Sequence, residues 1–353
     1  MNTVLITGAG APGIAGTIYA IRQNPDKRPF RIISTDISTN PVGRFLSDAF
    51  YVLPKPESSN YLNVLEEIFH KEKVDVIIPQ TTREIDLLSK HKASFNCKII
   101  VSGGENIERA NDKYLIIKEC EKTGVPFPKY FLVTDTKSLR EAIYQIGYPE
   151  KKVIVKPRMS NGLRGVRIIT EQSLTLKSYL GDKPSGLEID LATFLKIFEG
   201  VETFPELLVT EYMPGEEYSV DVFRTQKQTI IIPRIRKSIR SGISFETVVD
   251  LQRKDVIEYS QKLAESLDLN YCFGFQFKLD EKNVPKILES NPRVQGTMIA
   301  AAAAGCNMIY YSVIEALNPG GTYPFNLKDR VEFKRYWGGV GIDQQNNVII
   351  ESI

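Results

Sequence analysis

Two consecutive runs decide how this chain folds: Phe273-Gly-Phe-Gln-Phe-Lys-Leu279 and Pro285-Lys-Ile-Leu-Glu-Ser-Asn-Pro-Arg293. Each run predicts a strand, and the polar residues between them predict a turn, so the two strands are expected to be neighbours. Gln276 lies among aromatic residues in the first strand, whereas Glu289 and Asn291 share one face near the end of the second. Oxygen ligands of this kind suit Mg²⁺, which takes one or two carboxylates together with phosphate oxygens and water. We therefore predict metal ligands here; the alternative is a polar strand end that faces solvent.

The overall composition is that of an ordinary globular protein. With 353 residues the chain exceeds what one core usually supports, so two or three packed units are expected. A net charge of +2 predicts neither a nucleic-acid nor a membrane-surface partner. The four cysteines show no Cys-x-x-Cys spacing, which favours free thiols over a zinc site. Because no signal peptide and no membrane-spanning run is recognised, we expect a cytoplasmic protein.

The beginning of the chain alternates strands and helices. A short strand leads into the glycine-rich run Gly8-Ala-Gly-Ala-Pro-Gly13 and a helix-like stretch, and a second strand ends at Asp36. Some units of this kind bind a dinucleotide, with an acid such as Asp36 on the ribose. A single glycine turn is weak evidence, and the insertion of Pro12 favours a Rossmann-like scaffold without a cofactor. An NAD-dependent dehydrogenase or epimerase is the alternative. The alternation continues to about residue 110 and predicts parallel α/β layering.

The middle of the chain holds two lysines and a glycine loop. Lys113 lies at the start of a predicted helix, and the two prolines of Val125-Pro-Phe-Pro-Lys129 predict a linker. A strand then ends at Lys156, and the loop that follows contains Ser160, Gly162 and Gly165. The backbone N–H groups of such a loop can fold over phosphates, and Lys156 would point into the same space. A flexible hairpin is the alternative.

A basic strand follows later in the chain. Arg234, Arg236 and Arg240 fall on one face if the strand alternates regularly. Several guanidinium groups on one face suit an anionic substrate or a phosphate. A solvated basic edge strand is the alternative.

These pieces follow one another along the chain, and each answers a need of bound ATP: two lysines for the phosphates, carboxylates for the adenine and ribose, and a cation site. The matching runs resemble the ATP-grasp superfamily, and most closely the ligases that look like the large subunit of carbamoyl-phosphate synthase. They are Asn111-Asp-Lys113, Val155-Lys-Pro157, Glu211-Tyr-Met-Pro-Gly-Glu-Glu-Tyr-Ser-Val-Asp221 and Leu288-Glu-Ser-Asn-Pro-Arg293.

The resemblance implies a role for each position. Phosphate contacts are implied for Lys113, Lys156 and the lid residues Ser160, Gly162 and Gly165. Nucleoside contacts are implied for Glu211 on the adenine amino group, the Tyr212–Met213 backbone as hinge, and Glu217 on the ribose. Ligation of Mg²⁺, with Mn²⁺ as an alternative, is implied for Gln276, Asn291 and Glu289, which would bridge two ions. Catalytic roles are implied for Lys156 and for Arg293, which would steady the transferred phosphate.

The resemblance also implies a fold. It is an α/β protein, with an α+β ATP-grasp part, in four segments. These are a Rossmann-like pre-ATP-grasp domain (1–111), an ATP-grasp N-terminal subdomain with the phosphate lid (112–210), a C-terminal subdomain with the Mg²⁺ site (211–330) and a β tail (331–353) that includes Trp337.

The expected function is that of an ATP-dependent carboxylate–amine ligase that forms an acyl phosphate and releases ADP and phosphate. Its partners would be a small-molecule acid and amine, and a homodimer is left open. After Arg293 the chain continues with Val294-Gln-Gly-Thr297, where the synthase pattern has serines and a second arginine, which disfavours bicarbonate. Synthase-like phosphorylation of a small carboxylate or bicarbonate is therefore the alternative.

Overall fold

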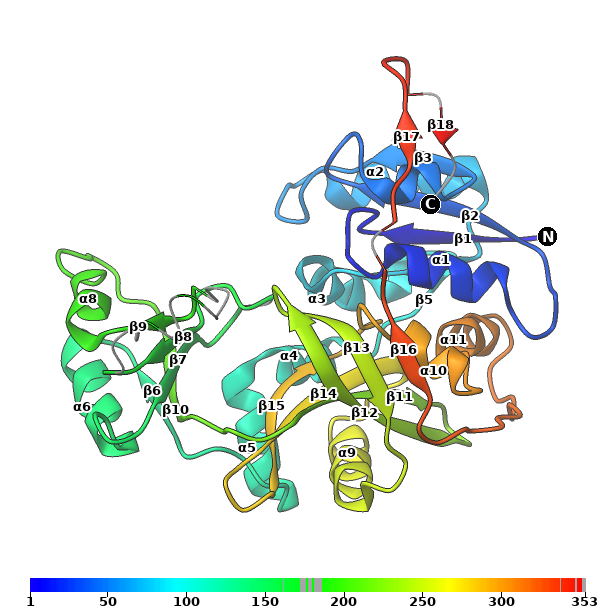
Figure 1. Ribbon diagram of the computed structural model, residues 1–353. Helices are drawn as coiled ribbons and strands as arrows, with labels where there is room; N and C mark the ends of the chain where they lie inside the picture. The colour runs from blue at the N-terminus through cyan, green and yellow to red at the C-terminus, as the bar shows by residue number, and fades with distance from the viewer. Residues whose placement is uncertain are drawn as a thin grey trace. The chain divides into compact units, whose positions relative to one another are not determined.

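The computed structural model describes residues 1–160, 162–171, 176, 180, 186–336, 338–346 and 348–350 (Figure 1). The chain divides into two compact units. Unit 1 comprises Met1–Asn111, Tyr218–Gln276 and Ser290–Ile353, and unit 2 comprises Asp112–Glu217 and Phe277–Glu289. The four segments expected from the resemblance stay a prediction, and Trp337 lies outside the described residues.

The N-terminal part of unit 1 is built on a five-stranded parallel sheet in the order β3-β2-β1-β4-β5. The central strand β1 has both faces covered, so Val4, Leu5 and Ile6 are completely buried. The strands are β1 (Asn2–Thr7), β2 (Phe30–Asp36), β3 (Ala49–Val52), β4 (Val76–Ile78) and β5 (Lys98–Ile99). The helical segments are α1 (Ile14–Arg22), η1 (Val42–Phe45), α2 (Tyr61–Glu72), α3 (Thr82–Lys90), η2 (Lys92–Ser94) and α4 (Gly104–Asn111).

A second, six-stranded sheet has the order β15-β14-β11-β12-β13-β16, and the division between the units passes through β14 and β15. Its strands are β11 (Glu217–Arg224), β12 (Thr229–Arg240), β13 (Ile243–Val249), β14 (Tyr271–Leu279), β15 (Pro285–Asn291) and β16 (Glu332–Lys334). The remaining elements of this part of the chain are α9 (Lys254–Ser266), α10 (Ile299–Ala303), α11 (Met308–Leu317), β17 (Gly341–Ile342) and β18 (Val348–Ile350). Strands β14 and β15 are neighbours in this sheet, which confirms the expected pairing of the two runs that opened the sequence analysis.

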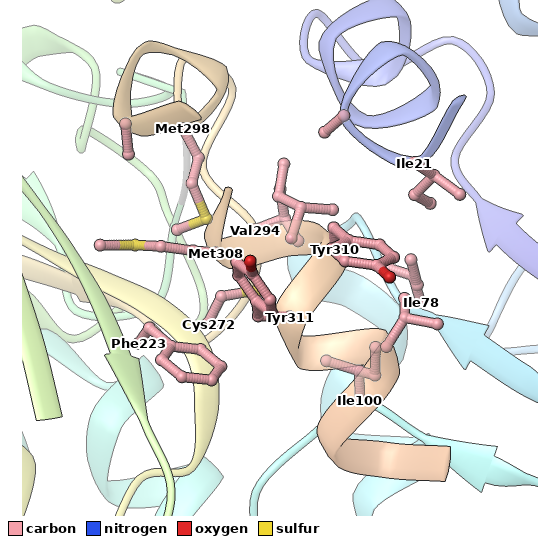
Figure 2. Packing of buried hydrophobic residues seen from close by; sticks show 14 of the residues in the cluster. Ile21, Ile78, Ile100, Phe223, Cys272, Val294, Met298, Met308, Tyr310 and Tyr311 are labelled. Carbon is pink, nitrogen blue, oxygen red and sulfur yellow. The ribbon is translucent and has the colours of Figure 1, made fainter. Parts of the chain in front are cut away.

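One hydrophobic cluster of unit 1 contains residues from both sheets and from α11. Figure 2 shows Tyr310 and Tyr311 of α11 between Ile78, from the parallel sheet, and Phe223, from β11. The ring of Tyr311 lies 5.0 Å from that of Tyr323, which in turn lies 5.6 Å from Phe223. Aromatic side chains bury large areas, so this cluster holds the N-terminal sheet and the strands of unit 1 in one core.

Unit 2 contains a five-stranded sheet in the order β6-β10-β7-β8-β9, in which only β8 and β9 are parallel. Its strands are β6 (Tyr130–Val133), β7 (Val153–Pro157), β8 (Arg167–Ile169), β9 (Glu188–Ile189) and β10 (Leu207–Glu211). Its described helices are α5 (Lys113–Thr123), α6 (Thr136–Ile146) and α8 (Leu191–Lys196). A separate cluster that includes Leu139, Val155 and Phe194 forms its core.

The expected fold class is confirmed. A parallel sheet at the N-terminus is followed by three sheets that contain antiparallel pairs, the last of them formed by β17 and β18, which gives an α/β protein with an α+β remainder. Within the described ranges, no helix is both long enough and apolar enough to cross a membrane.

Candidate active site

Two buried lysines form the centre of the candidate site in unit 2. Lys156 is the fourth residue of β7 and is 7% exposed, and Lys113 is the first residue of α5 and is 6% exposed. The helix starts there because the carboxylate of Asp112 accepts hydrogen bonds from the backbone N–H groups of Tyr114 and Leu115. The two lysines therefore owe their positions to a strand end and to a capped helix start.

The ammonium groups of these lysines donate hydrogen bonds to neutral oxygens. Lys156 Nζ donates to the carbonyl oxygen of Leu288 over 3.3 Å. Lys113 Nζ donates to the carbonyl oxygen of Ser160 and, over 3.2 Å, to its hydroxyl. Lys113 therefore anchors the first residue that we singled out in the glycine loop, Ser160.

Burial lowers the pKa of both lysines. The pKa of Lys156 falls to about 8, because desolvation and the nearby charge of Lys113 outweigh the attraction of Glu289. Desolvation also lowers the pKa of Lys113, against the attraction of Glu289 and Asp112. Two cations are thus buried near Glu289, and a bound polyphosphate would favour their charged forms.

The loop after β7 is anchored by Arg158, which the sequence did not single out. Its Nε donates to Asp112 Oδ2 over 2.7 Å, and its Nη1 lies 3.1 Å from Glu206 Oε2. The guanidinium also lies 5.1 Å from the centre of the Tyr114 ring. Arg158 therefore ties the capped start of α5 to the base of the loop. The position of Arg158, two residues after Lys156, could have suggested a role at the site. Its partner Asp112 could not be foreseen, because it lies 46 residues away in the sequence.

Two glycines of the loop occupy backbone conformations that other residues rarely adopt. Gly162 has a φ of +61° and Gly165 a φ of +75°. A Cβ atom at Gly165 would lie 2.5 Å from Pro157 Cγ, so a side chain there would force the loop away from the strand end. Asn161, between these positions and Ser160, lies outside the described residues.

The carboxylates predicted to bind the nucleoside are already partnered in unit 2. Glu211 Oε1 accepts from Lys129 N over 2.8 Å and from Lys286 Nζ over 2.7 Å. Glu217 Oε2 lies 3.8 Å from Lys278 Nζ. Lys286 and Lys278 lie on β15 and β14, so each pairs with its acid across a long stretch of sequence, and sequence reasoning missed both. Between the two acids, the ring of Tyr212 lies 5.8 Å from Lys152 Nζ, and Met213 is buried.

The predicted metal ligands differ in their surroundings. Glu289 belongs to unit 2 and attracts both lysines, whereas Gln276 and Asn291 belong to unit 1. Gln276 Oε1 accepts from Arg236 Nη1 over 3.4 Å, and Asn291 Oδ1 accepts from Arg293 Nη2 over 3.3 Å. In the part of the chain that is described, no three His, Cys, Asp or Glu residues cluster as a metal site would need. Carboxylate and amide oxygens are ligand types that Mg²⁺ accepts, and the binding of a metal by these three residues stays a prediction.

Arg293, predicted to steady the transferred phosphate, makes several contacts within unit 1. Its Nε donates to Thr82 Oγ1 over 3.0 Å and its Nη1 to the carbonyl oxygen of Val294 over 2.9 Å. Together with the bond to Asn291, these contacts fix the end of β15 against the start of α3. The role of Arg293 toward a phosphate stays a prediction.

The structure corrects the expectation for Arg234. This residue is completely buried, and its guanidinium binds Asp221 through two bonds, of 2.6 Å from Nε and 2.8 Å from Nη2. A third bond, of 3.0 Å, joins its Nη1 to Thr297 Oγ1. Gln295 Nε2 also donates to Asp221, over 3.2 Å. Arg234 is thus part of a buried network and is not presented to a substrate.

The three arginines also do not share one face of a regular strand. Two register shifts between Arg236 and Ile239 interrupt the alternation of β12, so the period-two argument fails before Arg240. Arg236 is held by Ser244 Oγ, at 2.7 Å, and by the carbonyl oxygen of Gly242, at 2.6 Å. Arg240 lies over the ring of Phe245, at 4.3 Å. Of the three, Arg236 is the one beside a predicted metal ligand.

Replacing Asp221 with Asn is expected to destabilise the protein by about 3–5 kcal/mol, because a buried guanidinium loses its counter-charge. Urea denaturation followed by circular dichroism measures this loss. The control is the double variant Asp221→Leu with Arg234→Met, which removes both charges and should recover much of the stability. If the free energy of unfolding of Asp221→Asn falls by less than about 1 kcal/mol, the negative charge of Asp221 is not what stabilises the buried guanidinium.

The glycine turn after β1 uses Asp36 within the protein. Asp36 Oδ2 accepts from Gly10 N over 2.7 Å, and its Oδ1 accepts from Ser38 N over 2.9 Å. Both carboxylate oxygens of Asp36 therefore accept hydrogen bonds from the backbone of the same turn region. This arrangement favours the scaffold interpretation, and the dinucleotide alternative stays open to an NAD(H) titration.

Comparisons with known proteins agree with this architecture. Residues 203–335 match a family described as "ATP-grasp in the biosynthetic pathway with Ter operon", and residues 4–101 match the PylC-like N-terminal domain. The carbamoyl phosphate synthase large chain of Clostridium acetobutylicum is 25% identical over 305 residues, which are 83% of this chain and 25% of that protein. The corresponding protein of Agathobacter rectalis is 24% identical over 245 residues, 66% of this chain and 21% of that protein. The chain thus spans a quarter or less of these relatives.

Solved structures share the fold along nearly the whole chain. N5-carboxyaminoimidazole synthetase from Staphylococcus aureus, complexed with ADP, has a TM-score of 0.68 and 19% identity, over 93% of this chain and 80% of that one. Biotin carboxylase from Campylobacter jejuni has a TM-score of 0.68 and 18% identity, over 94% and 74%. L-amino acid ligase from Bacillus licheniformis has a TM-score of 0.65 and 13% identity, over 90% and 75%. The family models therefore identify an ATP-grasp segment over residues 203–335 and a PylC-like N-terminal domain over residues 4–101, and the solved structures share the fold.

Proposed function

We propose that this protein is an ATP-dependent carboxylate–amine ligase. The observation that carries the proposal is the pair of buried lysines, Lys113 and Lys156, beside Glu289 in unit 2. Buried ammonium groups without a full complement of negative charge are costly in the free protein, so they favour a polyanionic ligand. The likeness to a synthetase solved with ADP supports a nucleotide as that ligand.

The reaction would proceed in two transfers. An oxygen of the acid's carboxylate attacks the γ-phosphorus of ATP, the bond to ADP breaks, and an acyl phosphate forms. The amine then attacks the acyl carbon, phosphate leaves, a carbon–nitrogen bond forms, and the amine's proton passes to solvent or to the departing phosphate. Mg²⁺, when bound by Glu289 with Gln276 and Asn291, neutralises charge on the phosphates.

The residues of this chain would position and shield the reactants. Lys113 and Lys156 would hold phosphate oxygens, and Arg293 would steady the group in transfer. The loop that carries Gly162 and Gly165 would close over the acyl phosphate and keep water away from it. The Glu211–Met213 segment and Glu217 would bind the nucleoside, and Arg236 is the basic residue that we assign to the acid.

The same site is compatible with a second reaction. Synthase-like phosphorylation of a small carboxylate or bicarbonate is supported by the likeness to carbamoyl phosphate synthase large chains. The run Val294–Thr297, which departs from the synthase pattern, favours the ligase. A cytoplasmic location is supported by the four free cysteines, all of which are buried, and a homodimer stays a prediction.

A screen of acids and amines for release of ADP and phosphate tests the proposal. A ligase should turn over continuously only when both an acid and an amine are present, and mass spectrometry should find the condensed product. Sustained ADP release with an acid alone would instead support the synthase-like reaction. Binding of NAD(H) together with no binding of MgATP would overturn both.

A further inference from the structure

Glu211, which we assign to the adenine amino group, is held on one side of its carboxylate by two donors. Its Oε1 accepts a hydrogen bond from the backbone N–H of Lys129 over 2.8 Å and another from Lys286 Nζ over 2.7 Å. Among the residues that the structure describes, none donates to its Oε2. The carboxylate therefore has one oxygen fixed within the protein and one oxygen left for a ligand.

The ion pair between Lys286 and Glu211 is largely shielded from water. The side chain of Lys286 is 18% exposed and that of Glu211 is 29% exposed. A second acid, Asp280, lies with its Oδ2 3.3 Å from Lys286 Nζ. Desolvation lowers the pKa of Lys286, but the hydrogen bonds and charges of Glu211 and Asp280 outweigh it and raise the pKa. The ammonium group thus stays charged and is held between two acids, unlike that of a freely exposed pair.

The backbone of β15 is fixed to the segment that faces Glu211. Ile287, the neighbour of Lys286, donates its N–H to the carbonyl oxygen of Pro126 over 3.1 Å. Pro126 lies in the linker that leads to Lys129, and Glu211 N donates to the carbonyl oxygen of Lys129 over 3.1 Å. Both donors to Glu211 Oε1 therefore come from segments that are hydrogen-bonded to each other.

The turn between β14 and β15 is fixed to the segment that follows Glu211. Gly215 N donates to the carbonyl oxygen of Leu279 and Leu279 N to that of Glu216, each over 3.0 Å. The two segments approach so closely that a Cβ atom on Gly215 would lie 2.6 Å from Leu279 Cβ. All of these residues belong to unit 2. The position of the Lys286 ammonium relative to the Glu211 carboxylate is thus set by the backbone on both sides.

A fixed carboxylate oxygen can distinguish purine bases by the group at their position 6. Adenine carries an amino group there, which donates, whereas guanine carries a carbonyl oxygen, which only accepts. The Oε2 atom of Glu211 can accept from the amino group, but it repels a carbonyl oxygen. Such repulsion rejects the wrong base only if the carboxylate cannot turn away. Base selectivity therefore depends on how firmly Glu211 is held.

We propose that Lys286 is a positioning residue that determines the preference of this site for ATP over nucleotides with a carbonyl group at position 6. It fixes Oε1 of Glu211 and so leaves Oε2 directed at the base. The inference rests on the proposed function, because it takes Glu211 as the residue that meets the adenine. It deepens that function by naming the side chain that sets nucleotide selectivity.

Displacement of a fluorescent ATP analogue by MgATP and by MgITP, in the wild type and in Lys286→Met, tests the proposal. ITP carries a carbonyl group at position 6 and, unlike GTP, no amino group at position 2, so it isolates the group that faces Glu211. The ratio of the Kd for ITP to the Kd for ATP should be at least about 100 in the wild type. It should fall at least about tenfold in Lys286→Met, because the released carboxylate can turn away from the carbonyl group.

Three further variants complete the test. Lys286→Arg keeps a charged donor and should retain most of the ratio. Lys286→Gln removes the charge but keeps a polar side chain, so it replaces Lys286→Met if circular dichroism shows that the latter does not fold. The matched control is Lys282→Met, which removes an exposed lysine from the turn between the same two strands and should keep both Kd values of the wild type.

A purely structural role of Lys286 would weaken the binding of ATP and ITP by the same factor. An unchanged ratio in Lys286→Met, or a wild type that binds the two nucleotides equally well, overturns the proposal. A wild type that binds no MgATP overturns both this inference and the ligase proposal, whereas MgATP binding with an unchanged ratio in Lys286→Met overturns this inference alone.

Discussion

Replacing Glu289 with Gln should lower the kcat of the ligase reaction about 100- to 1,000-fold, the loss that follows removal of one preorganised electrostatic partner. Glu289 is the carboxylate that attracts both Lys113 and Lys156, and it is the one acid among the three predicted Mg²⁺ ligands. Gln has the same shape and removes the charge, so the fold should persist. ADP release at saturating MgATP, with circular dichroism as a check of folding, measures the effect.

The matched control for this variant is Glu281→Gln, an exposed acid in the turn between the same two strands. It should retain wild-type activity. Because Glu289 raises the pKa of both lysines, its removal should also shift the pH dependence of ATP binding toward lower pH. Full activity of Glu289→Gln at an unchanged Mg²⁺ requirement would refute its assignment as a metal ligand.

The elements around the site could be predicted because their signals are local. Aromatic and β-branched residues mark the opening runs, and the structure has β14 at Tyr271–Leu279 and β15 at Pro285–Asn291. The same reasoning placed Lys156 near a strand end, where β7 has it, and Lys113 at the start of a helix, where α5 begins. Each of these inferences needs only neighbouring residues.

The partners of the charged side chains could not be predicted, because they come from distant parts of the sequence. Lys286 reaches Glu211 across 75 positions, and Arg335 reaches Pro12 across 323. The prediction that the arginines of the basic strand share one face was wrong for another reason. Burial of Arg234 against Asp221 depends on tertiary packing, and the register shifts of β12 break the alternation on which the argument relied.

ATP binding is expected to weaken as the pH rises through about 8, and Lys156→Met should remove most of that dependence. Burial and the charge of Lys113 lower the pKa of Lys156 to about 8, and the attraction of Glu289 opposes this shift only in part. The side chain is therefore charged below this pH and neutral above it. Phosphate oxygens prefer the charged form, so the apparent Kd should rise about tenfold for each pH unit above the pKa. Equilibrium binding of a fluorescent ATP analogue measures the dependence of the apparent Kd on pH over about three pH units, from about 6.5 to about 9.5.

The control for this variant is Lys151→Met, which removes an exposed lysine shortly before the same strand. Its loss should change neither the affinity nor its pH dependence. If Lys156→Met keeps the affinity and the pH profile of the wild type, Lys156 does not contact the phosphates. The residual dependence in Lys156→Met would report Lys113, whose pKa is lowered as well.

The same pKa shift predicts the opposite effect on stability. The pKa of Lys156 is lower in the folded protein than the ordinary 10.5, so the unfolded chain holds this proton more tightly and stability rises with pH between about 8 and 10.5. At pH 7 the buried charge therefore destabilises the nucleotide-free protein, by up to about 3 kcal/mol. Lys156→Met should then unfold at higher urea concentration while it binds ATP more weakly. A damaged fold would lower both quantities together, so this opposition assigns the loss of binding to the missing charge.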